Sequence, residues 1–235
     1  MREINSAKNE HIKELKKLAK KKYRDETGTY LIEGWHLLEE AGDAVIEVLS
    51  TDPERATTLV TKEVLVSLSD LPSTPEVVAV VRKSKPEKPD FNFGRYIALD
   101  NVQDPGNVGT IVRNADAFGF RGVLIGAGTA DIYSPKVMRS MQGSNFHLPI
   151  FTDVDLVELA KNHRVIATAL DETARRPENF RIEENTIVVL GNEGQGVSPE
   201  LLELAQDKLY IPMTGNAESL NVGVASGIIM YILRR

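Results

Sequence analysis

The sequence of 235 residues contains no cysteine. This absence excludes disulfides, zinc sites built on thiolates, and any reaction in which a cysteine attacks the substrate, such as addition to a pyrimidine ring. The chain also lacks an apolar run of 18 residues, and no apolar stretch follows the charges at its amino terminus. Neither a membrane span nor a secretory signal is indicated, so we expect a cytoplasmic protein without a membrane partner.

Charge is unevenly distributed along the chain. The net charge is −6, yet residues 1–25 hold nine Lys or Arg against four acidic residues, a balance of +5 that leaves −11 for the remainder. A compact basic segment on an acidic protein can steer a polyanion to one face. A lysine-rich helix surface that is merely solvated has the same composition, so the segment alone leaves both interpretations open.

The first part of the chain alternates between helical and strand patterns. We expect helices over 5–22, 35–41 and 61–69 and strands over 29–33, 45–50 and 77–81. This alternation predicts a small α/β domain with parallel strand pairing. The stretch from Arg82 to Asn92 contains two prolines, many charges and no periodicity, which is typical of a linker. We therefore predict a first domain over 1–85, a linker over 86–93 and a second domain over 94–235.

The second domain alternates more regularly. Strands are expected over 96–99, 123–125, 165–169, 187–190 and 209–211, with helices between them. Five such strands predict an open, mostly parallel α/β sheet. Ligands of these sheets bind outside the carboxyl ends of the strands. The residues that follow each strand are therefore the first candidates for a site.

Three polar clusters follow predicted strands. The first runs from Asn101 to Gly119 and includes Asn107 and Arg113, the second is Leu190-Gly-Asn-Glu-Gly-Gln-Gly-Val-Ser198, and the third is Ile211-Pro-Met with Ser219-Leu-Asn221. Each has an ordinary explanation when taken singly. A lone arginine is usually a surface charge, and an asparagine near a helix start is often its cap. Glycines in the second cluster let the backbone come close to a ligand or turn left-handed.

The carboxyl-terminal segment is apolar or small at almost every position from Leu220 to Leu233. A helix of this kind is expected to be buried on most sides. Gly223 and Gly227 stand one turn apart, and each is unfavourable in a helix by roughly 1 kcal/mol relative to alanine. We therefore expect another part of the protein to approach the helix closely there.

Together these clusters resemble the three signature motifs of the SpoU-type RNA ribose 2′-O-methyltransferases of the SPOUT superfamily. The motifs are Asn107-x-Gly-x-x-x-Arg113, Leu190-Gly-Asn-Glu-Gly194, and Ile211-Pro-Met followed by Ser219-Leu-Asn-Val222. They stand in the family's order and spacing, and the resemblance covers about residues 94 to 235. One departure is that members commonly read Ser-Leu-Asn-Val-Ser-Val-Ala-Ala-Gly, where this chain has Gly223 and Ser226.

The first domain resembles a second known element. Asn9-x-x-Ile-Lys, the basic segment after it, and Tyr30-Leu-Ile-Glu-Gly34 are similar to the ribosomal-protein-like RNA-binding domain that precedes the methyltransferase domain in the ribosomal-RNA branch of the family. The transfer-RNA members used for comparison typically lack this domain. The resemblance therefore favours ribosomal RNA over transfer RNA as the substrate.

The resemblance implies S-adenosylmethionine as methyl donor, a deep trefoil knot, and a homodimer in which Arg113 lies close to the cofactor of the other subunit. It also implies that Gly223 and Gly227 thin the last helix where the knotted loop or the partner subunit passes close by. No metal is required, and the four scattered histidines show no paired ligand spacing. The implied catalytic set is Arg113, Asn107, Glu193, Ser219 and Asn221. The residues expected to hold the cofactor are Ala169, Leu190, Gly191, Ile211, Met213 and Leu220.

Arg113 is a poor base because the pKa of an arginine is about 12 or above. We expect it to grip a flanking phosphate and to stabilise the developing alkoxide, a task that suits a guanidinium. Asn107, Ser219 and Asn221 would orient it and the ribose. Glu193 would serve as the base only if burial raised its pKa above the ordinary value.

Two other functions are compatible with parts of the sequence. Gly126-Ala-Gly128 after a strand is reminiscent of a dinucleotide-binding oxidoreductase, but Asp131 stands where the third glycine of that fingerprint belongs. The second alternative is an RNA-binding relative that has lost catalysis, and the intact signature residues disfavour it. A transfer-RNA ribose methyltransferase is the alternative within the family.

Overall fold

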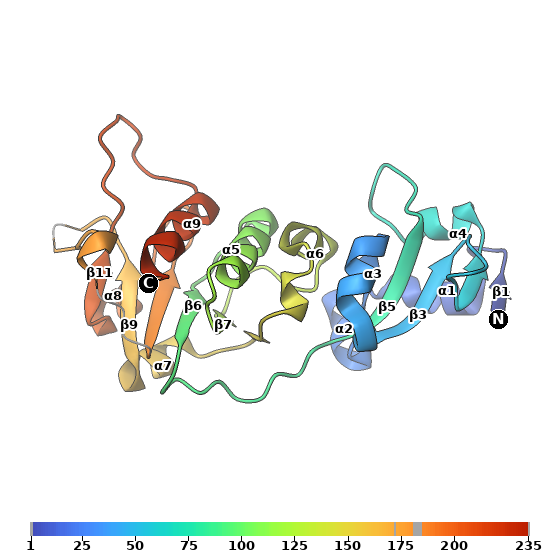
Figure 1. The fold of residues 1–235 in the computed structure, drawn as a ribbon, viewed down its shortest axis with the longest axis horizontal. Helices are drawn as coiled ribbons and strands as arrows, with labels where there is room; N and C mark the ends of the chain where they lie inside the picture. Colours follow the sequence, from blue (N-terminus) through green and yellow to red (C-terminus); the bar gives the residue numbers. More distant parts are fainter. Residues whose placement is uncertain (1, 172, 181–184, 235) are drawn as a thin grey trace. The chain divides into compact units, whose positions relative to one another are not determined.

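The computed structural model describes residues 2–171, 173–180 and 185–234. These residues form two compact units, one built from 1–85 and 133–146 and the other from 86–132 and 147–235 (Figure 1). The outer bounds of the predicted domains, Met1 and Arg235, lie outside the described residues. The segment 133–146 groups with the first unit although it follows a strand of the second.

The first unit contains one mixed sheet of five strands in the order β1-β4-β3-β5-β2. The strands are β1 Arg2–Ile4, β2 Thr29–Glu33, β3 Val45–Ser50, β4 Thr58–Val60 and β5 Val77–Arg82. The sequence patterns predicted β2 and β3 with these bounds and β5 to within one residue. They missed β1 and β4, which are only three residues long.

The expectation of parallel pairing in the first unit is wrong for β5. This strand pairs antiparallel with both β2 and β3, whereas β4 pairs parallel with β1 and β3. The helix between β4 and β5, α4 Lys62–Val66, has five residues. At 1.5 Å per residue it is too short to carry the chain back along the sheet. β5 therefore begins at the end of the sheet at which β4 finishes, and it runs in the opposite direction to β4.

The single helix expected over 5–22 is two short helices. They are α1 Glu10–Lys17, capped by the Asn9 side chain, and α2 Lys21–Thr27, which ends at Gly28 with φ of 67°. Ile12, Leu15 and Leu18 are buried and form the apolar face of this segment, whereas Ala19 is exposed. The other helices of this unit are α3 Trp35–Ala41 and α6 Pro135–Met141.

The second unit contains a six-stranded sheet in the order β11-β9-β10-β6-β7-β8, and every pair in it is parallel. The strands are β6 Arg95–Leu99, β7 Gly122–Ile125, β8 Ile150–Phe151, β9 Arg164–Thr168, β10 Thr186–Leu190 and β11 Asp207–Leu209. The helices are α5 Pro105–Ala117, α7 Leu156–Asn162, α8 Pro199–Leu204 and α9 Val222–Leu233. The prediction of a parallel α/β sheet is confirmed, and only the two-residue β8 was missed.

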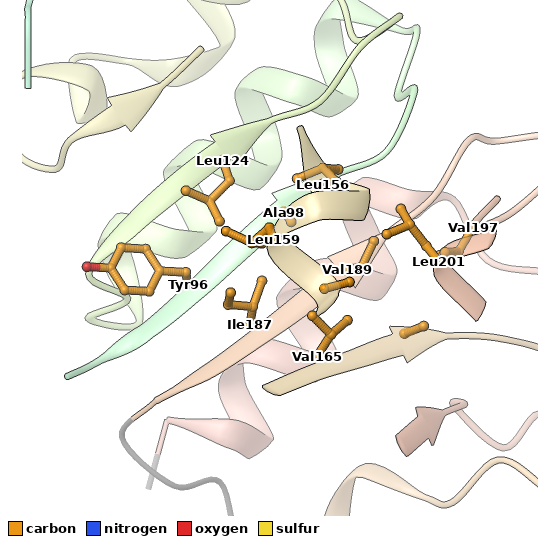
Figure 2. Packing of buried hydrophobic residues seen from close by; sticks show 12 residues of the cluster. Tyr96, Ala98, Leu124, Leu156, Leu159, Val165, Ile187, Val189, Val197 and Leu201 are labelled. Carbon is orange, nitrogen blue, oxygen red and sulfur yellow. The ribbon is translucent and has the colours of Figure 1, made fainter. Parts of the chain in front are cut away.

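One face of this sheet packs against α7 and α8 (Figure 2). Tyr96 and Ala98 of β6 contribute to the buried cluster together with Leu159 of α7 and Leu201 of α8. Successive residues of a strand point to opposite faces, so Ile97 and Leu99, both fully buried, serve the other side. Burial on both faces explains why these strands read as continuous apolar runs.

The last helix, α9, packs against α5 and is less buried than its sequence predicts. Val224 and Tyr231 are 55% and 54% exposed, so the described residues of the chain leave one side of α9 largely uncovered. No described helix is both long and apolar enough to cross a membrane. The deep trefoil knot stays a prediction.

Candidate active site

A cleft of about 660 Å³ opens at the carboxyl ends of β9, β10 and β11. Its walls include Thr168 at the end of β9, Leu190 at the end of β10 and Leu209 at the end of β11. The parallel direction of these strands gathers their carboxyl ends at one edge of the sheet. The structure brings to this cleft all six residues expected to hold a cofactor, namely Ala169, Leu190, Gly191, Ile211, Met213 and Leu220.

The loop after β10 depends on a close approach of two backbone segments. A Cβ placed on Gly191 would lie 2.1 Å from the carbonyl carbon of Gly196 and from the nitrogen of Val197. Asn192 and Gly196 also exchange backbone hydrogen bonds of 2.9 and 2.8 Å. Gly191 is therefore required for the loop to close, and the loop forms one wall of the cleft.

Asn107 on α5, from the first signature motif, forms hydrogen bonds with residues of both other motifs. Its Nδ2 donates to Oε1 of Glu193 at 2.9 Å, and its Oδ1 accepts from Nδ2 of Asn221 at 2.9 Å. The N-cap of α5 is Asp104, whose side chain accepts from the backbone nitrogen of Asn107. The alternative in which Asn107 merely caps the helix is therefore wrong.

Hydrogen bonds to the carboxylate control the ionisation of Glu193. Burial is the largest single influence and raises its pKa, but donation by the Asn107 side chain and by backbone N–H groups, including those of Gln103 and Asp104, outweighs it. The net pKa of Glu193 is below its ordinary value. The condition under which Glu193 would act as a base is therefore not met, and its geometry suits an anion that organises donors.

The loop after β6 is held against the loop after β10 by further contacts. Asn192 donates its side-chain N–H to the carbonyl of Asn101 at 2.9 Å, and the backbone nitrogen of Ser198 donates to Asp100 at 2.7 Å. Asn101 has φ of 57°, which is uncommon for a residue other than glycine. These contacts deliver the backbone donors of Gln103 and Asp104 to Glu193.

Two of the predicted catalytic residues do not join this network. Ser219 lines the cleft but is exposed, and it makes no hydrogen bond with the described residues. Arg113 is exposed on α5, outside the cleft lining, and has no hydrogen-bond or ion-pair partner among the residues described. Within one chain, Asn107, Glu193 and Asn221 are thus brought together and Arg113 is not.

Sequence reasoning missed several residues of the cleft. Leu170, the second residue after β9, is 70% exposed at the cleft, and Asp171, Tyr210 and Glu218 also line it. Asp171 accepts a hydrogen bond of 2.7 Å from Lys208, which is the largest of several influences that lower its pKa. For Leu170, Asp171 and Tyr210, a position just after a strand was the only signal available, and Glu218 had none.

Comparison with known proteins identifies the family. The model of the SpoU rRNA Methylase family matches residues 94–231, more than half of the chain. The chain belongs to this family. The model of the MRM3-like substrate binding domain matches residues 9–80, within the first unit. Both resemblances seen in the sequence are confirmed.

Relatives of this SpoU family member align over its whole length. It is 39% identical to the 23S rRNA (guanosine(2553)-2′-O)-methyltransferase RlmP of Bacillus subtilis, with all of both chains covered. An AdoMet-bound rRNA methyltransferase from Sinorhizobium meliloti is 28% identical with a TM-score of 0.87, covering 98% of this chain and 96% of that one. The SpoU methyltransferase AviRb from Streptomyces viridochromogenes, solved with AdoMet, is 27% identical with a TM-score of 0.80, covering 96% and 97%.

The family assignment leaves no support for an oxidoreductase. The glycines that suggested one have local packing roles instead. A Cβ on Gly126 would lie 2.8 Å from the carbonyl oxygen of Leu99, and one on Gly128 would lie 2.3 Å from Oδ1 of Asn101. Among the described residues, no group of three His, Cys, Asp or Glu is placed to hold a metal ion.

Proposed function

We propose that this protein transfers a methyl group from S-adenosylmethionine to a ribose 2′-hydroxyl of large-subunit ribosomal RNA. The observation that carries the proposal is the contact of Asn107 with both Glu193 and Asn221 beside a cleft formed by the other two signature motifs. Full-length similarity to a 23S rRNA ribose methyltransferase supports the same substrate class.

The cleft suits S-adenosylmethionine in volume and in lining. Ligand pockets span about 300 to 1,000 Å³ and combine apolar walls with a few polar groups. Leu190, Ile211 and Leu220 offer an apolar slot for the adenine, while the close backbone at Gly191 presents N–H and C=O groups. When bound there, the cofactor supplies an electrophilic methyl group.

The protein's own residues have to align the ribose 2′-hydroxyl with the methyl group and stabilise its oxygen as the hydroxyl proton leaves. Hydrogen bonds link three polar side chains from three parts of the fold, those of Glu193, Asn107 and Asn221. Because these side chains are already held in place, they need little reorganisation when the substrate binds. Because the pKa of Glu193 is lowered, its carboxylate remains ionised and orients Asn107. Arg113 is the cation that stabilises the alkoxide, and Ser219 contributes a hydroxyl at the cleft.

The exposed position of Arg113 fits a homodimer in which it completes the site of the partner. Support comes from α9, where Val224 and Tyr231 leave an apolar side uncovered. Phe118, at the end of α5, contacts Tyr231 edge-on at 5.9 Å and extends this apolar surface. A second copy that covers it would bury apolar area and would restore the burial expected of α9.

The first unit is proposed to grip RNA through lysines that have no acidic partner. Lys13, Lys17, Lys21 and Lys22 each form an ion pair with an acidic residue three or four positions away. Arg24 is buried and donates to the carbonyl of Leu18. Lys8, Lys16 and Lys20 form no ion pair with the described residues and remain available for phosphates.

Mapping of ribose methylation tests the function. Ribosomal RNA from cells with and without the gene is compared for 2′-O-methyl sites, and purified enzyme with labelled S-adenosylmethionine is then given the unmethylated RNA. One site in large-subunit RNA is expected to disappear and to be restored, and the guanosine equivalent to the RlmP target is the first to inspect. Methylation confined to transfer RNA would contradict the proposal. The similarity to a bacterial rRNA methyltransferase favours a cytoplasmic location.

Charge reversal separates the proposed RNA grip from the cofactor site. Lys16→Glu with Lys20→Glu is expected to raise the KM for RNA and to reduce the salt dependence of binding by about one unit of slope for each lost phosphate contact. Lys13→Glu with Lys17→Glu is the matched control, because those lysines already have partners. Equal loss of RNA and cofactor binding in the first variant would contradict the division of labour between the two units.

A further inference from the structure

The two helices that carry the first and third signature motifs meet through a side chain outside the expected catalytic set. Asn114 on α5 donates from Nδ2 to the carbonyl oxygen of Gly223 at 3.1 Å and to Oγ of Ser226 at 2.9 Å. Ser226 is fully buried, and its own hydroxyl donates to the same carbonyl at 2.7 Å. Asn114 therefore holds the first turn and a half of α9 at two points.

The glycines of α9 make this contact possible. A Cβ on Gly227 would lie 3.2 Å from Nδ2 of Asn114, and one on Gly223 would lie 3.2 Å from Thr110 and 3.4 Å from Oδ1 of Asn107. The expectation that these glycines accommodate a knotted loop or a partner subunit is therefore corrected, because side chains of α5 fill the space. The two departures from the family pattern, Gly223 and Ser226, are the two residues that Asn114 contacts.

Helix geometry connects Asn114 to the site. Asn107 and Asn114 are seven residues apart, so both lie on the side of α5 that faces α9. Asn107 bonds to Asn221, the N-cap of α9, and Asn114 bonds to the turn that follows. Two such contacts, two turns apart, fix the rotation of α5 about its axis, and that rotation decides where the neighbouring Arg113 points.

We propose that Asn114, acting through Ser226 and Gly223, is a positioning residue for methyl transfer, which locks α5 onto α9 so that Asn107 and Arg113 are correctly aimed. The inference rests on the proposed function. A hydroxyl at position 226 takes part in this lock, so the Ser226 side chain has a role that alanine cannot supply.

The test compares Asn114→Ala with Asp116→Ala. Asp116 lies on the same helix and also makes one side-chain hydrogen bond, to His147 at 2.9 Å, but not to α9. Misplacement of a reacting group by about 1 Å can cost on the order of a hundredfold in rate, so kcat of Asn114→Ala is expected to fall at least about tenfold. Its KM values for cofactor and RNA should stay within about twofold, because Asn114 does not line the cleft. Asp116→Ala should keep kcat.

Ser226→Ala supplies the second variant and a double-mutant cycle. It removes only the hydroxyl, and its loss of kcat is expected to be smaller than that of Asn114→Ala. The double variant should be hardly worse than Asn114→Ala alone, since both changes remove the hydrogen bond between Asn114 and Ser226. Losses that multiply in the double variant, or an Asn114→Ala enzyme with a raised KM and unchanged kcat, would overturn the proposal.

Hydrogen exchange keeps the two proposals distinguishable. The amides of Val224 and Ala225 in the first turn of α9 should exchange faster in Asn114→Ala than in Asp116→Ala. If the wild-type protein methylates no ribosomal RNA, the proposed function fails while faster exchange still supports the lock. Equal exchange in the two variants overturns the lock whether or not methylation is seen.

Discussion

Asn107 on α5 holds the cap of α9, because its Oδ1 accepts a hydrogen bond of 2.9 Å from Asn221. The same amide donates to Glu193 at 2.9 Å, and Oδ1 of Asn221 accepts from the backbone nitrogen of Val224. A carboxylate, two amides and a helix start thus form one chain of hydrogen bonds across the three signature motifs. Chains of this kind orient each member through its neighbours.

Asn107→Ala is expected to lower kcat by about a hundredfold, since both ends of this chain lose their partner. Affinity for S-adenosylmethionine should change little, because Asn107 does not line the cleft. Steady-state kinetics and calorimetric titration measure the two quantities. Thr110→Ala is the control, as its hydroxyl bonds only to Gly106 of its own helix. Equal activity of both variants would contradict the assignment.

The lowered pKa of Glu193 predicts a pH dependence at the acid end. A carboxyl group whose pKa is lower in the folded than in the unfolded protein stabilises the fold above its ordinary pKa of 4.5, and this contribution is lost as pH falls through the folded value. The difference in melting temperature between wild type and Glu193→Gln should therefore shrink as pH is lowered from about 6 to about 3. A difference that grows on acidification would mean that the pKa is raised.

Gly191→Ala should collapse one wall of the cleft. The new methyl group would lie 2.1 Å from backbone atoms of Gly196 and Val197, which cannot rotate away. Overpacking of this kind lowers the free energy of unfolding by about 1 to 3 kcal/mol, and cofactor affinity should fall with it. Gly194→Ala is the matched control, because its Cβ would meet only Oδ1 of Asn192 at 3.7 Å. Similar cofactor affinity in the two variants would remove Gly191 from the site.

Much of the site could be predicted because its parts are local in sequence. A parallel sheet places the ends of its strands at one edge, so residues that follow β9, β10 and β11 had to meet. That rule pointed to the strand ends where Ala169, Gly191 and Ile211 lie, and the resemblance to the family then singled out these residues. The strand-end rule could not predict the side-chain partners of Asn107. Whether Asn107 caps its own helix or bonds to Glu193 depends on a contact between residues 86 positions apart.

Other failures have a common physical origin in distant contacts. The direction of β5 depends on where the chain re-enters the sheet, which apolar periodicity does not encode. The burial of α9 was overestimated because an apolar face that is exposed in a single chain has the same composition as one packed inside it. Two-residue β8 and three-residue β1 give too few positions for a pattern.

The exposed side of α9 predicts how the protein associates. Val224→Asp should convert a dimer into a monomer, since a carboxylate without a partner is strongly unfavourable in an apolar interface. Sedimentation or light scattering measures the mass. Val66→Asp is the control, because Val66 is a similarly exposed valine on α4 of the first unit. Monomeric wild-type protein would contradict the proposed homodimer, and a dimer that survives Val224→Asp would place its interface elsewhere.

Mixing two inactive variants tests whether Arg113 acts across the dimer. Arg113→Ala and Asn221→Ala should each be inactive, and their subunits, once dissociated and reassorted at equal concentration, should form heterodimers in half of the population. In a heterodimer, the cleft of the Arg113→Ala subunit retains Asn221 and receives an intact Arg113 from its partner, whereas the other site has lost both groups. One site in four is then complete, so activity should recover to about a quarter of the wild-type value. If Arg113 instead served its own chain, every site would lack one group and mixing would restore nothing.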